Sequence, residues 1–148
     1  MNAVPYELRD HTADVAVEAT GETLDEVFGA VADGMAAAMC DTVPERGGAR
    51  FSLEVAAEGR EQLLFDYLDE LIYERDVRGV LPVDSEATVS GPANGQDGSD
   101  EGAWRVSATA RGVPLSEVDA RDLKAVTYSE MDLSETDEGW HAYVVFDV

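Results

Sequence analysis

Five consecutive residues near the start of the sequence, Asp10-His11-Thr12-Ala13-Asp14, place two carboxylates, an imidazole and a hydroxyl next to one another. Side chains two positions apart share one face of a β-strand, so Asp10, Thr12 and Asp14 can project together while His11 points the other way. Such oxygen ligands suit a hard cation, calcium or magnesium. The spacing permits a cation site, although a solvated turn is the more common use of such a cluster in an acidic protein.

A second candidate is Lys124, within the stretch Leu123–Tyr128. In an alternating strand Lys124, Val126 and Tyr128 would share one face, and a lysine there is often an edge charge that discourages aggregation. The sequence has nine arginines, however, and this single lysine. Retaining one compact, titratable ammonium group indicates a role that a guanidinium cannot fill. Both interpretations of Lys124 stay open.

The third candidate is the chain end, where an apolar run closes with Asp147 and Val148. A strand that ends in an aspartate brings its carboxylate to the rim of a sheet, with the terminal carboxylate close behind. If this strand lies beside the first strands, Asp147 could join Asp14 around a cation. The alternative is an ordinary frayed terminus.

Common enzyme signatures are absent from the sequence. It contains no glycine-rich phosphate loop, dinucleotide fingerprint, nucleophile elbow or paired-cysteine zinc site. Two histidines, His11 and His141, are too few for a multi-histidine metal centre within one chain. Cys40 is the only cysteine, so no internal disulfide can form, and its place at the end of an apolar helix predicts a packed, inert thiol.

The charge balance limits the partners of the protein. There are 32 acidic residues against 10 basic ones, for a formal net charge of −22. Such a field repels phosphate backbones and disfavours direct binding of nucleic acid. An acidic, lysine-poor surface is typical of a cytosol with very high salt, because dense counterions screen the self-repulsion. Without a signal-like start or a run long enough to cross a bilayer, we expect a cytoplasmic protein of a halophile that does not contact membranes.

The elements that must position these residues follow from periodicity and turn signals. Thr23 and Glu26 form a capping-box signature before the first helix. A polar segment at 91–102 predicts a flexible hairpin tip. The sequence predicts helices at 24–39 and 62–73, and strands at 6–8, 14–19, 51–55, 80–89, 104–108, 123–131 and 141–148. Residues 1–148 are therefore expected to form one α+β domain, a two-layer sandwich of a mixed or antiparallel sheet with two main helices.

The sequence resembles the archease family over nearly its whole length. The resemblance is carried by Tyr6–Val15, Gly21–Phe28, Leu64–Tyr73, Lys124–Tyr128 and Val145–Val148, of which the first and fourth stretches are the most specific. It implies an archease-like fold and an accessory protein of the RtcB-type RNA ligase, which joins tRNA halves after intron removal. Such a protein promotes guanylylation of the ligase histidine and allows repeated turnover and broader nucleotide use.

The resemblance also implies a bound divalent metal, calcium. Asp14 and Asp147 would be side-chain ligands, Val148 would add a main-chain or terminal oxygen, and Lys124 matches a lysine associated with activity. The protein would have no catalytic residues of its own, would act as a monomer, and would meet tRNA only through the ligase. Many archaeal members carry histidine where Ser129 stands here, and the polar hairpin looks like an enlarged, halophilic insertion.

Two other classes of function stay open. A free-standing metal-dependent hydrolase using Asp10, Asp14 and Asp147 would need an enclosed pocket with an open metal position. A general chaperone would need a large exposed apolar patch. An accessory protein would instead present these carboxylates on a convex rim.

Overall fold

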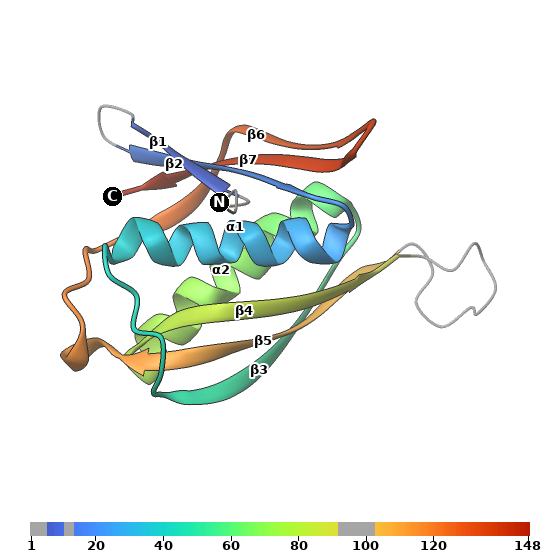
Figure 1. Ribbon diagram of the computed structural model, residues 1–148. Helices are drawn as coiled ribbons and strands as arrows, with labels where there is room; N and C mark the ends of the chain where they lie inside the picture. Colours follow the sequence, from blue (N-terminus) through green and yellow to red (C-terminus); the bar gives the residue numbers. More distant parts are fainter. Residues whose placement is uncertain (1–5, 11–13, 92–102) are drawn as a thin grey trace.

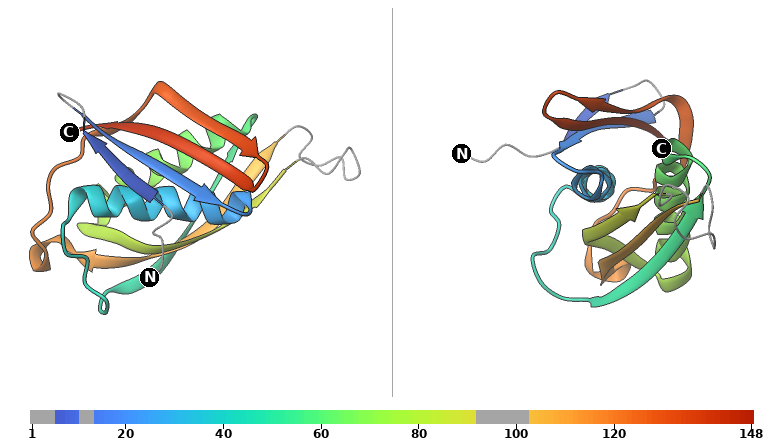
Figure 2. Two further views of the ribbon diagram at one scale, coloured as in Figure 1. Left: turned by 45° about the horizontal axis from the view of Figure 1, so that its top comes forward. Right: turned by 90° about the vertical axis from the view of Figure 1, so that its right-hand side faces the viewer.

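Two antiparallel sheets enclose a pair of helices (Figures 1 and 2). The computed structural model describes residues 6–10, 14–91 and 103–148, with only the backbone described for 7–10. One sheet has four strands in the order β1-β2-β7-β6, and the other has three in the order β3-β5-β4. In chain order the elements are β1 (Tyr6–Asp10), β2 (Asp14–Gly21), α1 (Leu24–Met39), β3 (Ala49–Ala57), α2 (Arg60–Arg78), β4 (Val80–Ser90), β5 (Trp104–Pro114), η1 (Leu115–Glu117), β6 (Ala125–Thr136) and β7 (Gly139–Asp147).

Helix α1 begins and ends where the sequence predicts. At its start, the Thr23 hydroxyl accepts a hydrogen bond from the Glu26 N–H at 3.1 Å, and the Glu26 carboxylate accepts one from the Glu22 N–H at 3.0 Å. The helix is buried on nearly every side, because it lies between β2 of one sheet and β4 of the other. Gly34 allows the close approach to β2, since a Cβ there would lie 2.5 Å from Cγ1 of Val17.

Helix α2 is longer than the predicted 62–73. It packs leucines at helical spacing into the core and contacts β3 and β6. Its last turn is polar, from Glu74 to Arg78, and ends at Gly79 in the left-handed conformation (φ 67°). Because apolar residues do not recur at helical spacing in this last turn, the predicted helix ends too early, at residue 73.

The α+β class, the two helices and the antiparallel pairing are confirmed. The layering differs from the expected sandwich of one sheet, since the strands are divided between two sheets with the helices in the middle layer. The reason is that α1 is apolar nearly all round, so both of its sides need cover. The predicted hairpin tip lies outside the described residues beyond Gly91, although β4 and β5 on either side of it pair with each other. In the described part of the chain, no helix combines the length and the apolar character needed to cross a membrane.

Candidate functional site

The first and last residues of two neighbouring strands bring the predicted carboxylates together. Asp14 begins β2 and lies directly opposite Asp147, which ends β7. Opposed residues of an antiparallel pair have Cβ atoms about 4.5–5.5 Å apart and side chains on the same face. Val148, which is exposed, follows Asp147 at the same end of the sheet. The sequence analysis required that the last strand lie beside the first ones for Asp147 to meet Asp14, and the pairing of β7 with β2 meets this requirement.

Lys124 joins the same end of the sheet. Its backbone N–H donates to the Asp147 carbonyl oxygen at 2.8 Å, and the next residue, Ala125, pairs with Asp147. Lys124 is exposed and precedes β6, so its predicted place inside an alternating strand is wrong. Of its two expected face-mates, Val126 is buried and Tyr128 is exposed, because the register of β6 breaks after Thr127.

A buried arginine, which the sequence analysis missed, holds the segment that carries Lys124. Arg75 of α2 is only 8% exposed, and its Nη1 donates to the Leu123 carbonyl oxygen at 2.7 Å. Its Nε forms an ion pair with Asp76 at 2.9 Å. The available signal was helical spacing, since Arg75 follows the apolar positions Leu68 and Ile72 on one face of α2.

A second arginine fixes the same segment to the end of α1. The Arg121 N–H donates to the Met39 carbonyl oxygen at 2.5 Å, and its Nε donates to the Ala38 carbonyl oxygen at 3.1 Å. Its Nη2 lies 2.9 Å from a carboxylate oxygen of Asp41, and this contact lowers the pKa of Asp41. These bonds satisfy carbonyls that the end of a helix leaves open. Both helices therefore determine where Lys124 lies.

The donor set at this end suits a hard cation. Two carboxylates directly opposite each other repel, and a divalent cation between them would offset that repulsion. Carboxylate and carbonyl oxygens are the ligands that calcium takes. Among the described residues no group of three or more His, Cys, Asp or Glu side chains could hold a metal ion. A cation here would therefore rest on Asp14 and Asp147 together with main-chain or terminal oxygens such as those of Val148.

The other residues of the opening cluster are described only in part. The Asp10 backbone pairs with Val15 at the end of β1, so the residue lies at the same end of the sheet. His11 and Thr12 lie outside the described residues. Ser129 is exposed, and its N–H donates to the Thr127 hydroxyl at 3.2 Å.

The rim formed by Asp14, Asp147 and Lys124 is open. Asp147, Val148 and Lys124 are all exposed, and Asp14 is half-buried. A hydrolase built on these carboxylates would need an enclosed pocket around them. The carboxylates and the lysine lie at an open surface, and the fold and the rim together define a small α+β protein with an acidic rim beside its one lysine.

The comparisons with known proteins give the family. The sequence model of the Archease protein family (MTH1598/TM1083) matches residues 6–148. Protein archease of Methanosarcina mazei is 33% identical over 146 residues, covering 97% of this chain and 95% of that protein. Protein archease of Thermococcus kodakarensis is 31% identical over 147 residues, covering 97% and 98%. The chain belongs to the archease family.

Solved structures agree with this assignment. The solution structure of Methanobacterium thermoautotrophicum protein 1598 superposes with a TM-score of 0.78 at 30% identity, covering 99% of this chain and all of that one. The crystal structure of TM1083 from Thermotoga maritima, described as an archease and possible chaperone, superposes with a TM-score of 0.60 and covers 95% of this chain and 94% of that one. At 20% identity this second likeness supports the fold alone.

Proposed function

We propose that this protein activates an RtcB-type RNA ligase in tRNA splicing, by promoting guanylylation of the ligase histidine and repeated turnover. The observation that carries the proposal is the meeting of Asp14, Asp147 and Lys124 at one open rim of the sheet. Family membership supports it, since the rim is built from the motifs that resemble the archease family. The protein would contribute no catalytic residue of its own.

The chemistry of the rim suggests how it would assist. Calcium, held by oxygens of Asp14, Asp147 and Val148, would supply positive charge beside the ligase active site. The Lys124 ammonium group, fixed through its backbone to Asp147, would pair with the phosphates of the bound nucleotide or with acidic groups of the ligase. The net charge of −22 opposes contact with RNA, so the tRNA would be met only through the ligase.

A guanylylation assay with the purified ligase tests the proposal. The wild-type protein should raise the fraction of ligase labelled by radioactive GTP, while Asp14→Asn and Lys124→Ala should reduce labelling to that of the ligase alone. Asp69→Asn is the matched control, because it also removes one carboxylate but from the exposed face of α2. Circular dichroism and melting temperature establish that each variant is folded.

Two results would count against it. If Asp14→Asn and Lys124→Ala both stimulate as well as Asp69→Asn, the rim is not the functional site. If the wild-type protein leaves labelling unchanged but suppresses aggregation of an unfolded protein, the chaperone alternative replaces ligase activation. Lys124→Arg separates the need for any positive charge from the need for an ammonium group.

A further inference from the structure

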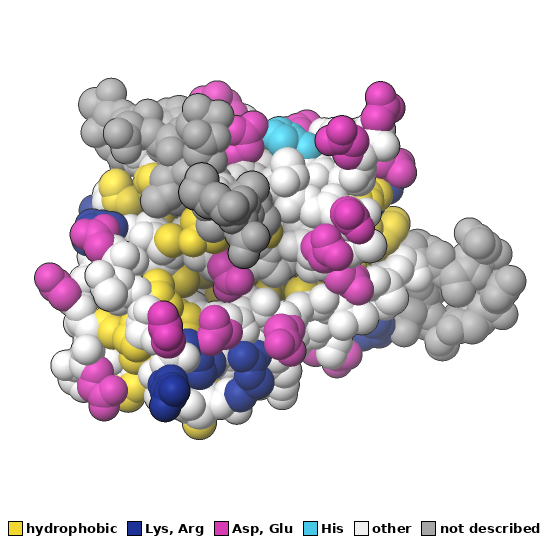
Figure 3. Space-filling model, in the orientation of Figure 1, with side chains coloured by type: hydrophobic (Ala, Val, Ile, Leu, Met, Phe, Trp, Pro, Cys, Tyr) yellow, Lys and Arg dark blue, Asp and Glu magenta, His cyan; other side chains and the backbone are white. Residues whose placement is uncertain are grey.

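A cavity of about 420 Å³ lies between α1 and β4, away from the Asp14 rim. Its lining includes Thr20, Asp25, Glu26, Asp33, Ser85 and Glu86. Thr20 is six residues along β2 from Asp14, which is about 20 Å in an extended strand. Figure 3 shows carboxylate side chains gathered over the first half of α1, with arginines lying below, over the three-stranded sheet. The cavity is thus separate from the proposed metal rim.

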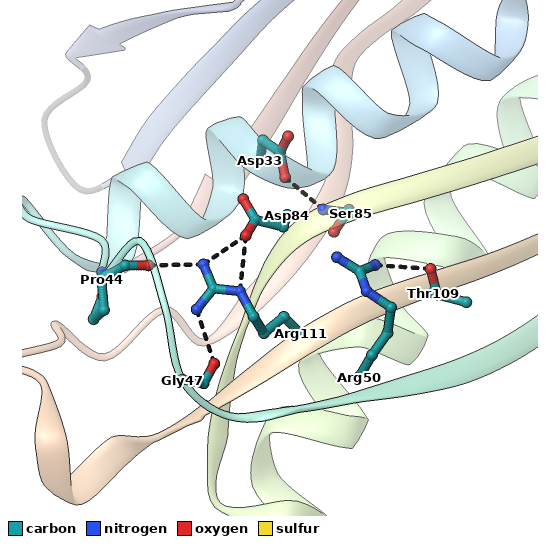
Figure 4. Close-up of polar contacts among 8 residues, drawn as sticks. All are labelled: Asp33, Pro44, Gly47, Arg50, Asp84, Ser85, Thr109 and Arg111. Carbon is teal, nitrogen blue, oxygen red and sulfur yellow. Dashed lines mark hydrogen bonds and ion pairs between the residues drawn. The ribbon is translucent and has the colours of Figure 1, made fainter.

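Helix α1 covers the free edge of β4 with two carboxylates. Among the described strands β4 pairs only with β5, so within the described residues its other edge has no strand partner. Asp33 accepts a hydrogen bond from the Ser85 N–H at 2.9 Å (Figure 4), and Asp25 accepts one from the Val89 N–H at 2.7 Å. Between them lies Gly29, where a Cβ would come within 3.2 Å of the Ser85 carbonyl oxygen. The missing side chain lets α1 lie close against the edge of β4 at this point.

The edge of β4 adds backbone acceptors to this space. In an antiparallel strand the N–H and C=O of one residue point to the same side, and alternate residues repeat that direction. The N–H groups of Ser85 and Val89 face α1, so the backbone of Ala87 between them does too. The carbonyl oxygens of Ser85 and Ala87 are therefore directed toward the cavity.

The Ser85 side chain is a further acceptor that the described part of the protein does not use. Ser85 lines the cavity and is 9% exposed, and its Oγ is shielded from solvent with no hydrogen-bond partner among the described residues. The Tyr67 hydroxyl lies close enough for Ser85 to influence its pKa, but the two hydroxyls do not meet hydrogen-bond geometry. A buried hydroxyl without a partner is costly, and a bound donor would remove that cost.

Nearby arginines are engaged elsewhere (Figure 4). Arg111 binds the Asp84 carboxylate with Nε at 2.8 Å and also bonds two loop carbonyls, and Arg50 donates to the Thr109 hydroxyl at 2.8 Å. Burial, aided by the charge of Asp84, raises the pKa of Asp33 to about 6. The negative charge of the cavity is therefore only partly compensated within the protein.

We propose that this cavity binds an organic cation, a guanidinium or primary ammonium group on an alkyl chain. The carboxylates and backbone carbonyls argued above are acceptors, and the Ser85 hydroxyl can accept as well as donate. Asp25 and Asp33 lie eight residues apart on α1, about 12 Å along the helix axis, so they are too far apart to bind one metal ion together. An extended cation with several N–H donors instead matches acceptors spread along α1 and β4. The cation could come from a free polyamine or from an arginine or lysine side chain of a partner protein.

Titration of the full-length, ¹⁵N-labelled protein at constant high salt tests the proposal. The probes are spermidine and agmatine as free amines, and N-acetyl-argininamide as a stand-in for a protein side chain. Tetramethylammonium is the control, because it carries the charge without N–H donors. We expect saturable shifts of the Ser85 and Val89 amide signals with at least one N–H donor probe and none that saturate with tetramethylammonium. The probe that binds more tightly identifies the source of the cation.

Variants locate the binding. Ser85→Ala and Asp33→Asn should each weaken binding, the latter by about tenfold or more, because hydrogen bonds to charged groups are strong. Asp69→Asn, with the same loss of charge on the far face of α2, should leave binding unchanged. The proposal is overturned if no N–H donor probe saturates, if tetramethylammonium binds equally well, or if Asp69→Asn weakens binding as much as Asp33→Asn. Ser85→Ala keeps the backbone bond to Asp33, so it remains informative if Asp33→Asn unfolds.

Discussion

Replacing Arg75 with methionine should lower the free energy of unfolding by about 2 kcal/mol. Arg75 is buried, yet its guanidinium connects α2 to the segment before β6 through the Leu123 carbonyl oxygen at 2.7 Å. It also lies 3.3 Å from the Met39 sulfur and 2.9 Å from Asp76. Methionine keeps most of the apolar stem but none of the donors. The substitution therefore isolates the polar contacts of Arg75.

The magnitude follows from what each contact loses. A hydrogen bond to a charged donor contributes about 1.5–3 kcal/mol, and the buried Leu123 carbonyl would be left without it. The pair with Asp76 adds about 0–1 kcal/mol, because that carboxylate is largely exposed. Removing a buried guanidinium also relieves its desolvation, which offsets part of the loss. About 2 kcal/mol remains.

Urea denaturation at constant high salt measures the change, with the slope of the transition checked for equality between variants. Arg78→Met is the matched control, because Arg78 lies about one turn along α2, is 45% exposed and pairs with Glu74 of the same helix. It should cost less than about 1 kcal/mol. Equal losses in the two variants, or a loss at Arg75 below about 0.5 kcal/mol, would refute the assigned role of Arg75.

Two further predictions follow from packing and from charge. Gly34→Ala should destabilise by about 1–3 kcal/mol through overpacking, because the new Cβ would meet Val17 Cγ1 at 2.5 Å; a melting temperature above wild type would contradict it. The hydrogen bond that His141 Nε2 donates to the Glu18 carboxylate at 2.7 Å raises the pKa of His141 above 6.5. The folded state then holds the proton more tightly, so this stabilisation is complete below about pH 6.5 and is lost as the pH rises through the folded pKa. In His141→Asn the urea midpoint should therefore fall less as the pH rises than it does in the wild type. If the two proteins show the same pH dependence of the midpoint, His141 is not its source.

The elements with local signals were predictable from the sequence. Helix α1 was placed at 24–39 because a capping box precedes an apolar periodicity that runs to its last residue. The end of α2 was not predictable in this way. Its buried Arg75 donates a hydrogen bond to the Leu123 carbonyl oxygen, which lies 48 residues further along the chain. A contact of that range leaves no local pattern except the spacing of one arginine on an apolar face.

The rim was predictable in its residue types but not in its geometry. The residue types and the family resemblance singled out Asp14, Lys124 and Asp147, and only the pairing of β2 with β7 brings the two aspartates face to face. The alternation assumed for Lys124 fails because β6 carries an irregularity between Thr127 and Asp132. Glu130, a non-glycine residue within this irregularity, has a φ of 60°. A sequence with period two cannot reveal where the period breaks.

For Asp25 and Asp33 of α1, the acidic composition of the protein suggests the wrong role. With 32 acidic residues, each carboxylate read alone is best explained as part of a solvated surface. Asp25 and Asp33 instead bond the free edge of β4, and they share one helix face with Gly29 between them at intervals of four. Their face is the one directed at a strand, so each carboxylate replaces a missing backbone partner. In a chain this acidic, the informative carboxylates are those whose helical spacing turns them inward, and the glycine between Asp25 and Asp33 marks where the helix approaches the strand most closely.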